Sequence, residues 1–129
     1  MSPKRILVVD DEDDIREVAA LSLQAVGGWE VLSARSGTEG IAAAVAEQPD
    51  AILLDVMMPG VDGPTTFRRL RDDPRTRDIP VILLTAKAQA GDLQCFAQLG
   101  VTGVLSKPFD PMALSDQVAG LLAGPPGGG

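Results

Sequence analysis

The chain has 129 residues, of which 45% are hydrophobic and 22% charged, and its formal net charge is −7. This is the size of one ordinary domain with a buried core, and the composition excludes wholesale disorder. The acidic balance and an aromatic content of 3% argue against direct binding of nucleic acid. The chain has no histidine, so its chemistry must come from carboxylates, lysines and hydroxyls.

Length and residue usage also bear on location. No apolar run approaches the roughly 20 residues that a membrane-spanning helix needs, and the basic amino terminus precedes too short an apolar run for a signal peptide. The single cysteine excludes an internal disulfide. We therefore expect a cytoplasmic protein without a membrane partner. Residues 1–123 should form one domain, and the Gly/Pro-rich residues 124–129 a flexible tail or linker.

Five short apolar runs alternate with amphipathic stretches along the chain. We expect strands at Arg5–Val9, Glu30–Ala34, Ala51–Leu54, Pro80–Leu84 and Gly103–Leu105. Helices are expected at Asp13–Val26, Gly37–Glu47, Gly63–Arg71, Asp92–Leu99 and Pro111–Ala123, the last with Asp110 as its cap. Repeated strand–helix units predict an α/β fold with a doubly wound, five-stranded parallel sheet and five helices. The flavodoxin-like strand order 2-1-3-4-5 is favoured.

Three aspartates follow two of these strands. Asp10 and Asp11 come after the first strand, and Asp55 comes after the third. In the order 2-1-3-4-5 these strands are neighbours, so the three carboxylates should meet at one edge of the sheet. Such crowding is unfavourable unless a cation or a reaction compensates for it, and oxygen ligands favour Mg²⁺ before Ca²⁺. For Asp13 and Asp14 the simpler interpretation is stabilisation of a helix start.

A hydroxyl and an ammonium are expected at the same edge. Thr85 follows the fourth strand, and Lys107 follows the fifth and precedes a proline, which holds it extended and permits a cis bond. A lysine and a metal ion facing a carboxylate form a site for a phosphoryl group, because both neutralise its oxygens during transfer. Asp55 would be the nucleophile, since a carboxylate can form an acyl phosphate.

From about Lys4 to Leu122 the chain resembles a receiver domain of the two-component response-regulator family. The matching segments are Ile6–Glu12, Leu53–Gly60, Asp62-Gly63, Leu84–Ala86 and Lys107–Phe109. The resemblance implies that Asp55 accepts a phosphoryl group from the phosphohistidine of a histidine kinase or phosphotransfer protein. It also implies Mg²⁺ held by Asp11, Asp55 and the backbone carbonyl of Met57, with Asp10 acting through water.

The resemblance further implies how the signal leaves the site. Lys107 would contact a phosphoryl oxygen, and Thr85 would carry the change to the face formed by the fourth helix, fifth strand and fifth helix. The family usually has an aromatic residue where this chain has Val104, so we expect a departure from the aromatic switch. The downstream effector is not identified, and a homodimer through the fourth and fifth helices stays open.

Three other functions compete with a phosphoacceptor that turns over no external substrate. A Mg²⁺-dependent phosphohydrolase passing through an aspartyl phosphate commonly has a second acid two residues after the nucleophile, but Met57 stands there. A flavodoxin-like cofactor carrier needs a first loop that cradles phosphate, and the acids from Asp10 to Asp14 would repel it. A receiver-like module that binds partners without phosphorylation is the third alternative.

Overall fold

The computed structural model of the protein describes residues 4–86, 96 and 98–123. Its strands are β1 (Arg5–Val9), β2 (Glu30–Ala34), β3 (Ala51–Asp55), β4 (Val81–Thr85) and β5 (Gly103–Ser106). They form one parallel sheet in the order β2-β1-β3-β4-β5, which confirms the predicted order. Strands β1 and β3 are therefore neighbours, and residues beyond their carboxyl ends lie side by side.

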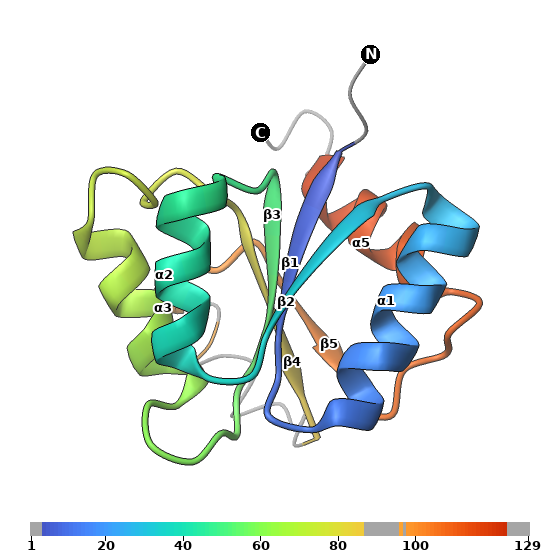
Figure 1. Ribbon diagram of the computed structural model, residues 1–129, viewed down its shortest axis with the longest axis horizontal. Coiled ribbons are helices and arrows are strands. Elements are labelled where there is room, and N and C mark those ends of the chain that lie inside the picture. Colours follow the sequence, from blue (N-terminus) through green and yellow to red (C-terminus); the bar gives the residue numbers. More distant parts are fainter. Residues whose placement is uncertain (1–3, 87–95, 97, 124–129) are drawn as a thin grey trace.

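Helices cover both faces of the sheet. The described helices are α1 (Asp13–Gly27), α2 (Gly37–Glu47), α3 (Gly63–Asp72) and α5 (Leu114–Ala123). Helices α2 and α3 lie on one side of the sheet, and α1 and α5 on the other (Figure 1). The predicted helix at Asp92–Leu99 falls mainly outside the described residues. Within the described ranges, no helix combines the length and hydropathy needed to cross a bilayer.

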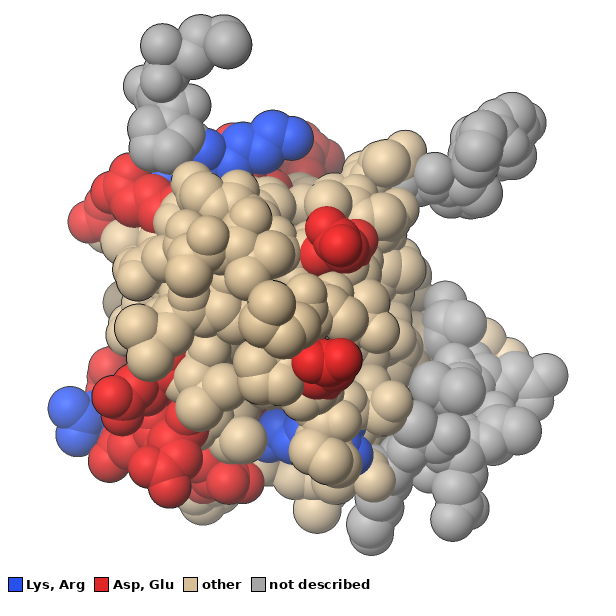
Figure 2. All heavy atoms as spheres, turned by 90° about the vertical axis from the view of Figure 1, so that its right-hand side faces the viewer, with Lys and Arg blue, Asp and Glu red and all other residues tan. Residues whose placement is uncertain are grey.

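The two faces differ in charge. On the side of α1 and α5, uncharged surface fills the centre, and acidic groups are spread more widely than basic ones (Figure 2). Helix α1 begins with Asp13 and Asp14, and α5 carries Asp116 in its first turn. By contrast, five of the eleven lysines and arginines of the chain lie between Arg68 and Arg77.

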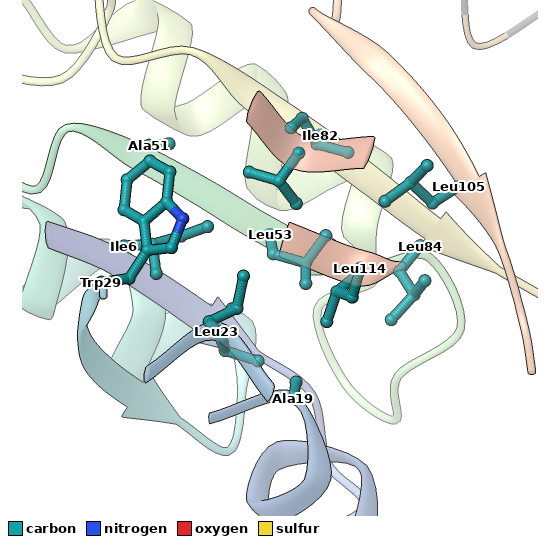
Figure 3. Close-up of a cluster of buried hydrophobic side chains, with 12 residues drawn as sticks. Ile6, Ala19, Leu23, Trp29, Ala51, Leu53, Ile82, Leu84, Leu105 and Leu114 are labelled. Carbon is teal, nitrogen blue, oxygen red and sulfur yellow. The ribbon is translucent and has the colours of Figure 1, made fainter. Parts of the chain in front are cut away.

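The core lies on both faces of the three central strands. Every residue of β3 and β4 is buried, as are four of the five residues of β1. On one face Ile6, Leu53 and Leu84 pack with Leu23 of α1 and Leu114 of α5 (Figure 3). Burial of each such side chain contributes about 1.5–3 kcal/mol. This apolar packing holds the carboxyl ends of β1, β3 and β4 in fixed positions.

Three strands extend one residue beyond their predicted ends. Asp55 pairs with Leu84, and Thr85 pairs with Ser106, so each continues the parallel ladder. The apolar runs alone mark where burial of hydrophobic side chains ends, whereas pairing continues through the following polar residue. Asp55 and Thr85 consequently belong to strands and not to loops.

The last helix begins later than predicted. Helix α5 starts at Leu114 rather than at Pro111. Asp110 instead organises a turn: its Oδ1 accepts a hydrogen bond from the amide of Met112 at 2.9 Å, and its carbonyl accepts from the amides of Ala113 and Leu114. Asp110 therefore caps the turn that leads into α5, which explains why its sequence has the signature of a helix start.

Candidate functional site

Three carboxylates converge at the carboxyl edge of the sheet. Val9 pairs with Leu54 in the β1–β3 ladder, so Asp10 and Asp55 are the next residues on adjacent strands. One carboxylate oxygen from each of Asp10, Asp11 and Asp55 lies within 4.8 Å of the others. Asp10 is 0% and Asp55 2% exposed, whereas Asp11 is exposed. The crevice thus combines two buried acids with one that faces solvent.

Lys107 supplies the counter-charge. Its Nζ lies 2.9 Å from Asp10 Oδ2 and 3.1 Å from Asp55 Oδ1, and the side chain is 12% exposed. The peptide bond between Lys107 and Pro108 is cis. Burial opposes the charged ammonium, but hydrogen bonds and charge attraction from Asp10 and Asp55 outweigh it, so the pKa of Lys107 is raised. Lys107 is therefore a cation at neutral pH, shared between two acids.

The environment of Asp55 opposes its ionisation. Burial raises the pKa of this carboxyl from 3.8 to about 6, and the charge of Asp10 adds to the rise. The hydrogen bond from Lys107 and a backbone hydrogen bond at Met57 act in the other direction. At neutral pH Asp55 is thus mainly ionised, in a position where its negative charge is poorly solvated.

Two carboxylate oxygens in the crevice lack hydrogen bonds. Within the described ranges, neither Asp10 Oδ2 nor Asp55 Oδ2 has a hydrogen-bond partner, although Asp10 Oδ2 forms the ion pair with Lys107. Unsatisfied buried oxygens are unfavourable unless another group binds them. One carboxylate oxygen of Asp55 lies near an oxygen of Asp10 and an oxygen of Asp11, so the donor set fits a divalent cation that prefers oxygen ligands.

The loop after β1 is held by hydrogen bonds that fix Asp10. The amide of Asp10 donates to the carbonyl of Ala34 at 3.1 Å, and the amide of Glu12 donates to Asp10 Oδ1 at 2.9 Å. Arg16 Nη1 donates to the carbonyl of Asp10 at 2.7 Å, and Arg16 also pairs with Asp13. Arg16 is a supporting residue that the apolar runs do not predict; its signal in the sequence is its position as the one basic residue between Asp10 and Glu17.

Helix α3 begins directly against Asp55. The amide of Gly63 donates to the carbonyl of Val56 at 3.0 Å. A Cβ added at Gly63 would lie 2.4 Å from the carbonyl oxygen of Asp55 and 2.7 Å from the Cα of Val56. The neighbouring Asp62 caps the helix by accepting a hydrogen bond from the amide of Thr65 at 2.9 Å. Glycine is thus required at this close approach of two backbone segments.

Thr85 and Met57 flank the carboxylates. Thr85 is buried at the end of β4, beside β3, and its carbonyl accepts a hydrogen bond from the amide of Lys107 at 2.8 Å. Met57, two residues beyond Asp55, has a 60% exposed side chain. The side chain of Met57 is therefore free to meet a partner, while its backbone remains close to Asp55. A hollow of about 490 Å³ beside it is lined by Val56, Met57, Met58, Pro59, Asp62 and Pro64.

The fold and the crevice define a class: doubly wound α/β domains with an acidic pocket, a threonine and a lysine at the carboxyl edge of the sheet. Residues 6–119 match the response regulator receiver domain, and the chain belongs to this family. It is 43% identical to the DNA-binding dual master transcriptional regulator RpaA of Synechocystis sp. over 92% of this chain and 48% of that protein. It is 40% identical to the phosphate regulon transcriptional regulatory protein PhoB of Pseudomonas aeruginosa, over 95% and 53%.

Solved structures agree with this assignment. A putative response regulator from Chloroflexus aurantiacus superimposes with a TM-score of 0.86 at 36% identity, covering 95% of this chain and 99% of that one. The chain spans about half the length of the two curated relatives. It is a receiver domain of response regulators, a class of signalling module in two-component systems.

Proposed function

We propose that this receiver domain is a phosphoacceptor switch and that Asp55 is the residue phosphorylated. The observation that carries the proposal is the position of Lys107 Nζ, between Asp10 and Asp55 and 3.1 Å from Asp55 Oδ1, while Asp55 Oδ2 has no hydrogen-bond partner among the described residues. Residues 1–123 would form the switch, with residues 124–129 as a tail or linker.

The transfer uses the ionised form of Asp55. A carboxylate oxygen attacks the phosphorus atom of a phosphohistidine on a histidine kinase or phosphotransfer protein. An acyl phosphate bond forms as the phosphorus–nitrogen bond breaks, and the nitrogen keeps the bonding electron pair. A pKa of about 6 leaves most Asp55 side chains ionised at neutral pH. The carboxylate is therefore reactive without a separate general base.

The neighbouring residues supply charge and position. Asp11, Asp55 and the backbone carbonyl of Met57 would hold Mg²⁺, with Asp10 acting through a water molecule. When bound, the metal neutralises negative charge on the phosphoryl oxygens. The ammonium of Lys107 is already 3.1 Å from Asp55 Oδ1, so it reaches an oxygen of a phosphoryl group attached there.

The conformational change that follows phosphorylation of Asp55 would pass through β4 and β5. Thr85 lies opposite Ser106 in the ladder, so a rotation of its hydroxyl toward the phosphoryl group alters the edge of the sheet next to α5. Val104, on β5, is partly buried against the core. Because valine has one stiff torsion and no ring to rotate, the response would be a backbone-led rearrangement of residues 86–91, which lie mainly outside the described residues. The receiving partner would be an effector protein.

Mass spectrometry after incubation with acetyl phosphate and Mg²⁺ tests the proposal. We expect the native chain to gain one phosphoryl group, and Asp55→Asn, which keeps the shape of the side chain, to gain none. Asp116→Asn is the matched control, because it removes an exposed carboxylate on α5 and should leave the adduct intact. An adduct that persists in Asp55→Asn would contradict the assignment.

The same incubation with acetyl phosphate also distinguishes the phosphoacceptor from the two alternative functions. A receiver-like module that acts without phosphorylation would give no adduct with the native chain. A phosphohydrolase would release inorganic phosphate continuously. The exposed side chain of Met57 has no acidic group to protonate a leaving group, so we expect the adduct to persist and no external substrate to be turned over.

A further inference from the structure

We propose that the arginines at the carboxyl end of α3 form a docking surface for an acidic segment of a partner protein. The arginine surface consists of Arg68, Arg69, Arg71, Arg75 and Arg77, all of them exposed. Five of the eleven lysines and arginines of the chain thus lie within ten residues, in a domain of net charge −7. With Asp72 and Asp73 in the same ten residues, the segment still has more positive than negative side chains, and this local excess favours a partner of the opposite sign.

Two of these arginines maintain the shape of the surface. Arg71 Nη2 donates to the carbonyl of Gly100 at 2.6 Å, and its guanidinium lies 5.1 Å from the centre of the Phe67 ring. Arg75 donates hydrogen bonds to both carboxylate oxygens of Asp73, from Nε to Oδ1 at 3.1 Å and from Nη2 to Oδ2 at 2.9 Å. These contacts anchor the end of α3 and the following turn, so the arginine surface is a fixed feature of the fold.

The other three arginines are available to a partner. Within the described ranges, Arg68, Arg69 and Arg77 have no hydrogen bond or ion pair through their side chains. Arg68 is attracted to the charge of Asp62, and Arg77 to the charge of Asp73. Neither arginine forms an ion pair within 4.0 Å among the described residues, so their guanidinium donors stay available. A guanidinium fork that is not already paired binds a carboxylate through two parallel hydrogen bonds.

The arginine surface contains a hollow that can accept a carboxylate side chain of a partner. A shallow hollow of about 540 Å³ is lined by Arg69, Asp72, Asp73, Pro74 and Arg75. Asp73 is already paired with Arg75, which reduces its repulsion toward an incoming acid. A carboxylate that enters the hollow meets Arg69 without displacing the ion pair between Arg75 and Asp73, with Asp72 as the unpaired acidic neighbour in the same hollow.

The arginine surface is separate from the phosphorylation site. Helix α3 starts beside Asp55 and runs for ten residues, which places the turn that carries Arg75 and Arg77 about 15 Å away along the helix axis, while Arg68 lies near the middle of the helix. It also lies on the side of the sheet opposite α1 and α5 (Figure 1). A partner bound here would leave the crevice open, so docking does not depend on the phosphorylation proposed above.

The interspersed acids favour a protein over a nucleic acid. Asp72 and Asp78 are exposed among the arginines, and a continuous phosphate backbone passing over them would be repelled. An acidic protein segment carries separate carboxylates, so it can place one beside Arg69 and keep the others away from Asp78. An aromatic content of 3% also offers few rings on which bases could stack.

A titration followed by amide chemical shifts in solution tests the surface, with hexaglutamate as the probe. We expect shifts at residues 68–77 that diminish as salt is added. The double variant Arg69→Gln/Arg77→Gln should weaken binding about fivefold, the effect of losing two exposed ion pairs. The control Lys4→Gln/Arg35→Gln removes the same charge from exposed positions elsewhere and should change affinity less than about twofold.

Several outcomes would overturn the inference. Equal weakening in both double variants would show general charge attraction and no docking surface. Tighter binding of an oligothymidylate to the same residues would assign the surface to nucleic acid. Absence of shifts at residues 68–77 would remove the surface altogether. Asp55→Asn should bind hexaglutamate as the native chain does, so failure of the phosphorylation proposal would leave this result unchanged.

Discussion

At the scale of single residues, Lys107 offsets the electrostatic cost of burying Asp10 and Asp55 in the folded protein. Its ammonium lies within 3.1 Å of two buried carboxylates, and it is also 3.9 Å from Glu12. Removing one partner from a buried ion pair leaves a charge without compensation, and this is more destabilising than the pair itself is stabilising. The lysine that would bind the phosphoryl group therefore also stabilises the resting fold.

Replacing Lys107 by methionine should lower the free energy of unfolding by about 2 kcal/mol at about pH 7.5. At about pH 5 the loss should be smaller, because Asp55, with a pKa of about 6, is then largely protonated and needs no counter-charge. Urea unfolding followed by circular dichroism measures both values. Lys4→Met, at an exposed site, is the control, and an equal loss at the two pH values would contradict the explanation.

At the scale of elements, the close contact between α3 and β3 positions the site. Gly63→Ala should destabilise the protein by about 2 kcal/mol or more, because the new Cβ would lie 2.4 Å from the carbonyl oxygen of Asp55 and force two backbone segments apart. It should also slow phosphorylation of Asp55, because the carboxylate moves away from Lys107.

Gly120→Ala is the comparison for this variant. Gly120 is within α5, and no atom lies within 4 Å of the position of its added Cβ. Alanine there should stabilise the protein by about 0.5–1 kcal/mol, since the helix gains propensity without a clash. Thermal unfolding of both variants checks the pair, and a similar effect in the two would argue against a special role for the contact at Gly63.

Sequence patterns predicted the elements because burial and helix signals are local. The helix at Gly37–Glu47 has the predicted bounds, and its start is marked by Ser36, which caps it through the amide of Glu39. The start of α5 was predicted too early because Asp110 followed by proline marks a turn as well as a helix. Local patterns do not distinguish these two outcomes.

The sequence predicts which residues lie at the candidate site, but it does not predict their ion pairs or pKa values. Asp10, Asp55 and Lys107 each follow an apolar run, so the strand order brings them to one edge. Which atoms pair depends on side-chain positions set by contacts between distant segments. The sharing of Lys107 between two acids, the support of Asp10 by Arg16, and the raised pKa of Asp55 all depend on such contacts.

At the scale of the whole molecule, the acidic crevice makes stability depend on pH. The pKa of Asp55 is about 6 in the folded protein and 3.8 for an unperturbed carboxyl. The carboxyl group of Asp55 therefore stays protonated to higher pH in the folded state than in the unfolded state. The contribution of Asp55 to stability is complete below pH 3.8 and is lost as the pH rises through about 6.

We therefore expect the metal-free native chain to lose about 2 kcal/mol of unfolding free energy between about pH 4.5 and 7.5 through Asp55. Other groups titrate in the same range, so the quantity to measure is the difference from Asp55→Asn, which lacks this carboxyl. The variant should be the more stable of the two at the higher pH, and the difference should shrink toward the lower pH. Parallel pH profiles for the two chains would contradict the raised pKa.

Addition of Mg²⁺ at about pH 7.5 completes the experiment, because a ligand that binds only the folded state stabilises it by about 2.7 kcal/mol at one hundred times its dissociation constant. Native chain should regain the stability that ionisation of Asp55 removed, whereas Asp55→Asn and Asp11→Asn should regain less. Equal stabilisation of all three chains would place the cation elsewhere. The negative charge of the clustered aspartates would then have two effects. It destabilises the metal-free fold through repulsion, and it binds the cation when Mg²⁺ is present.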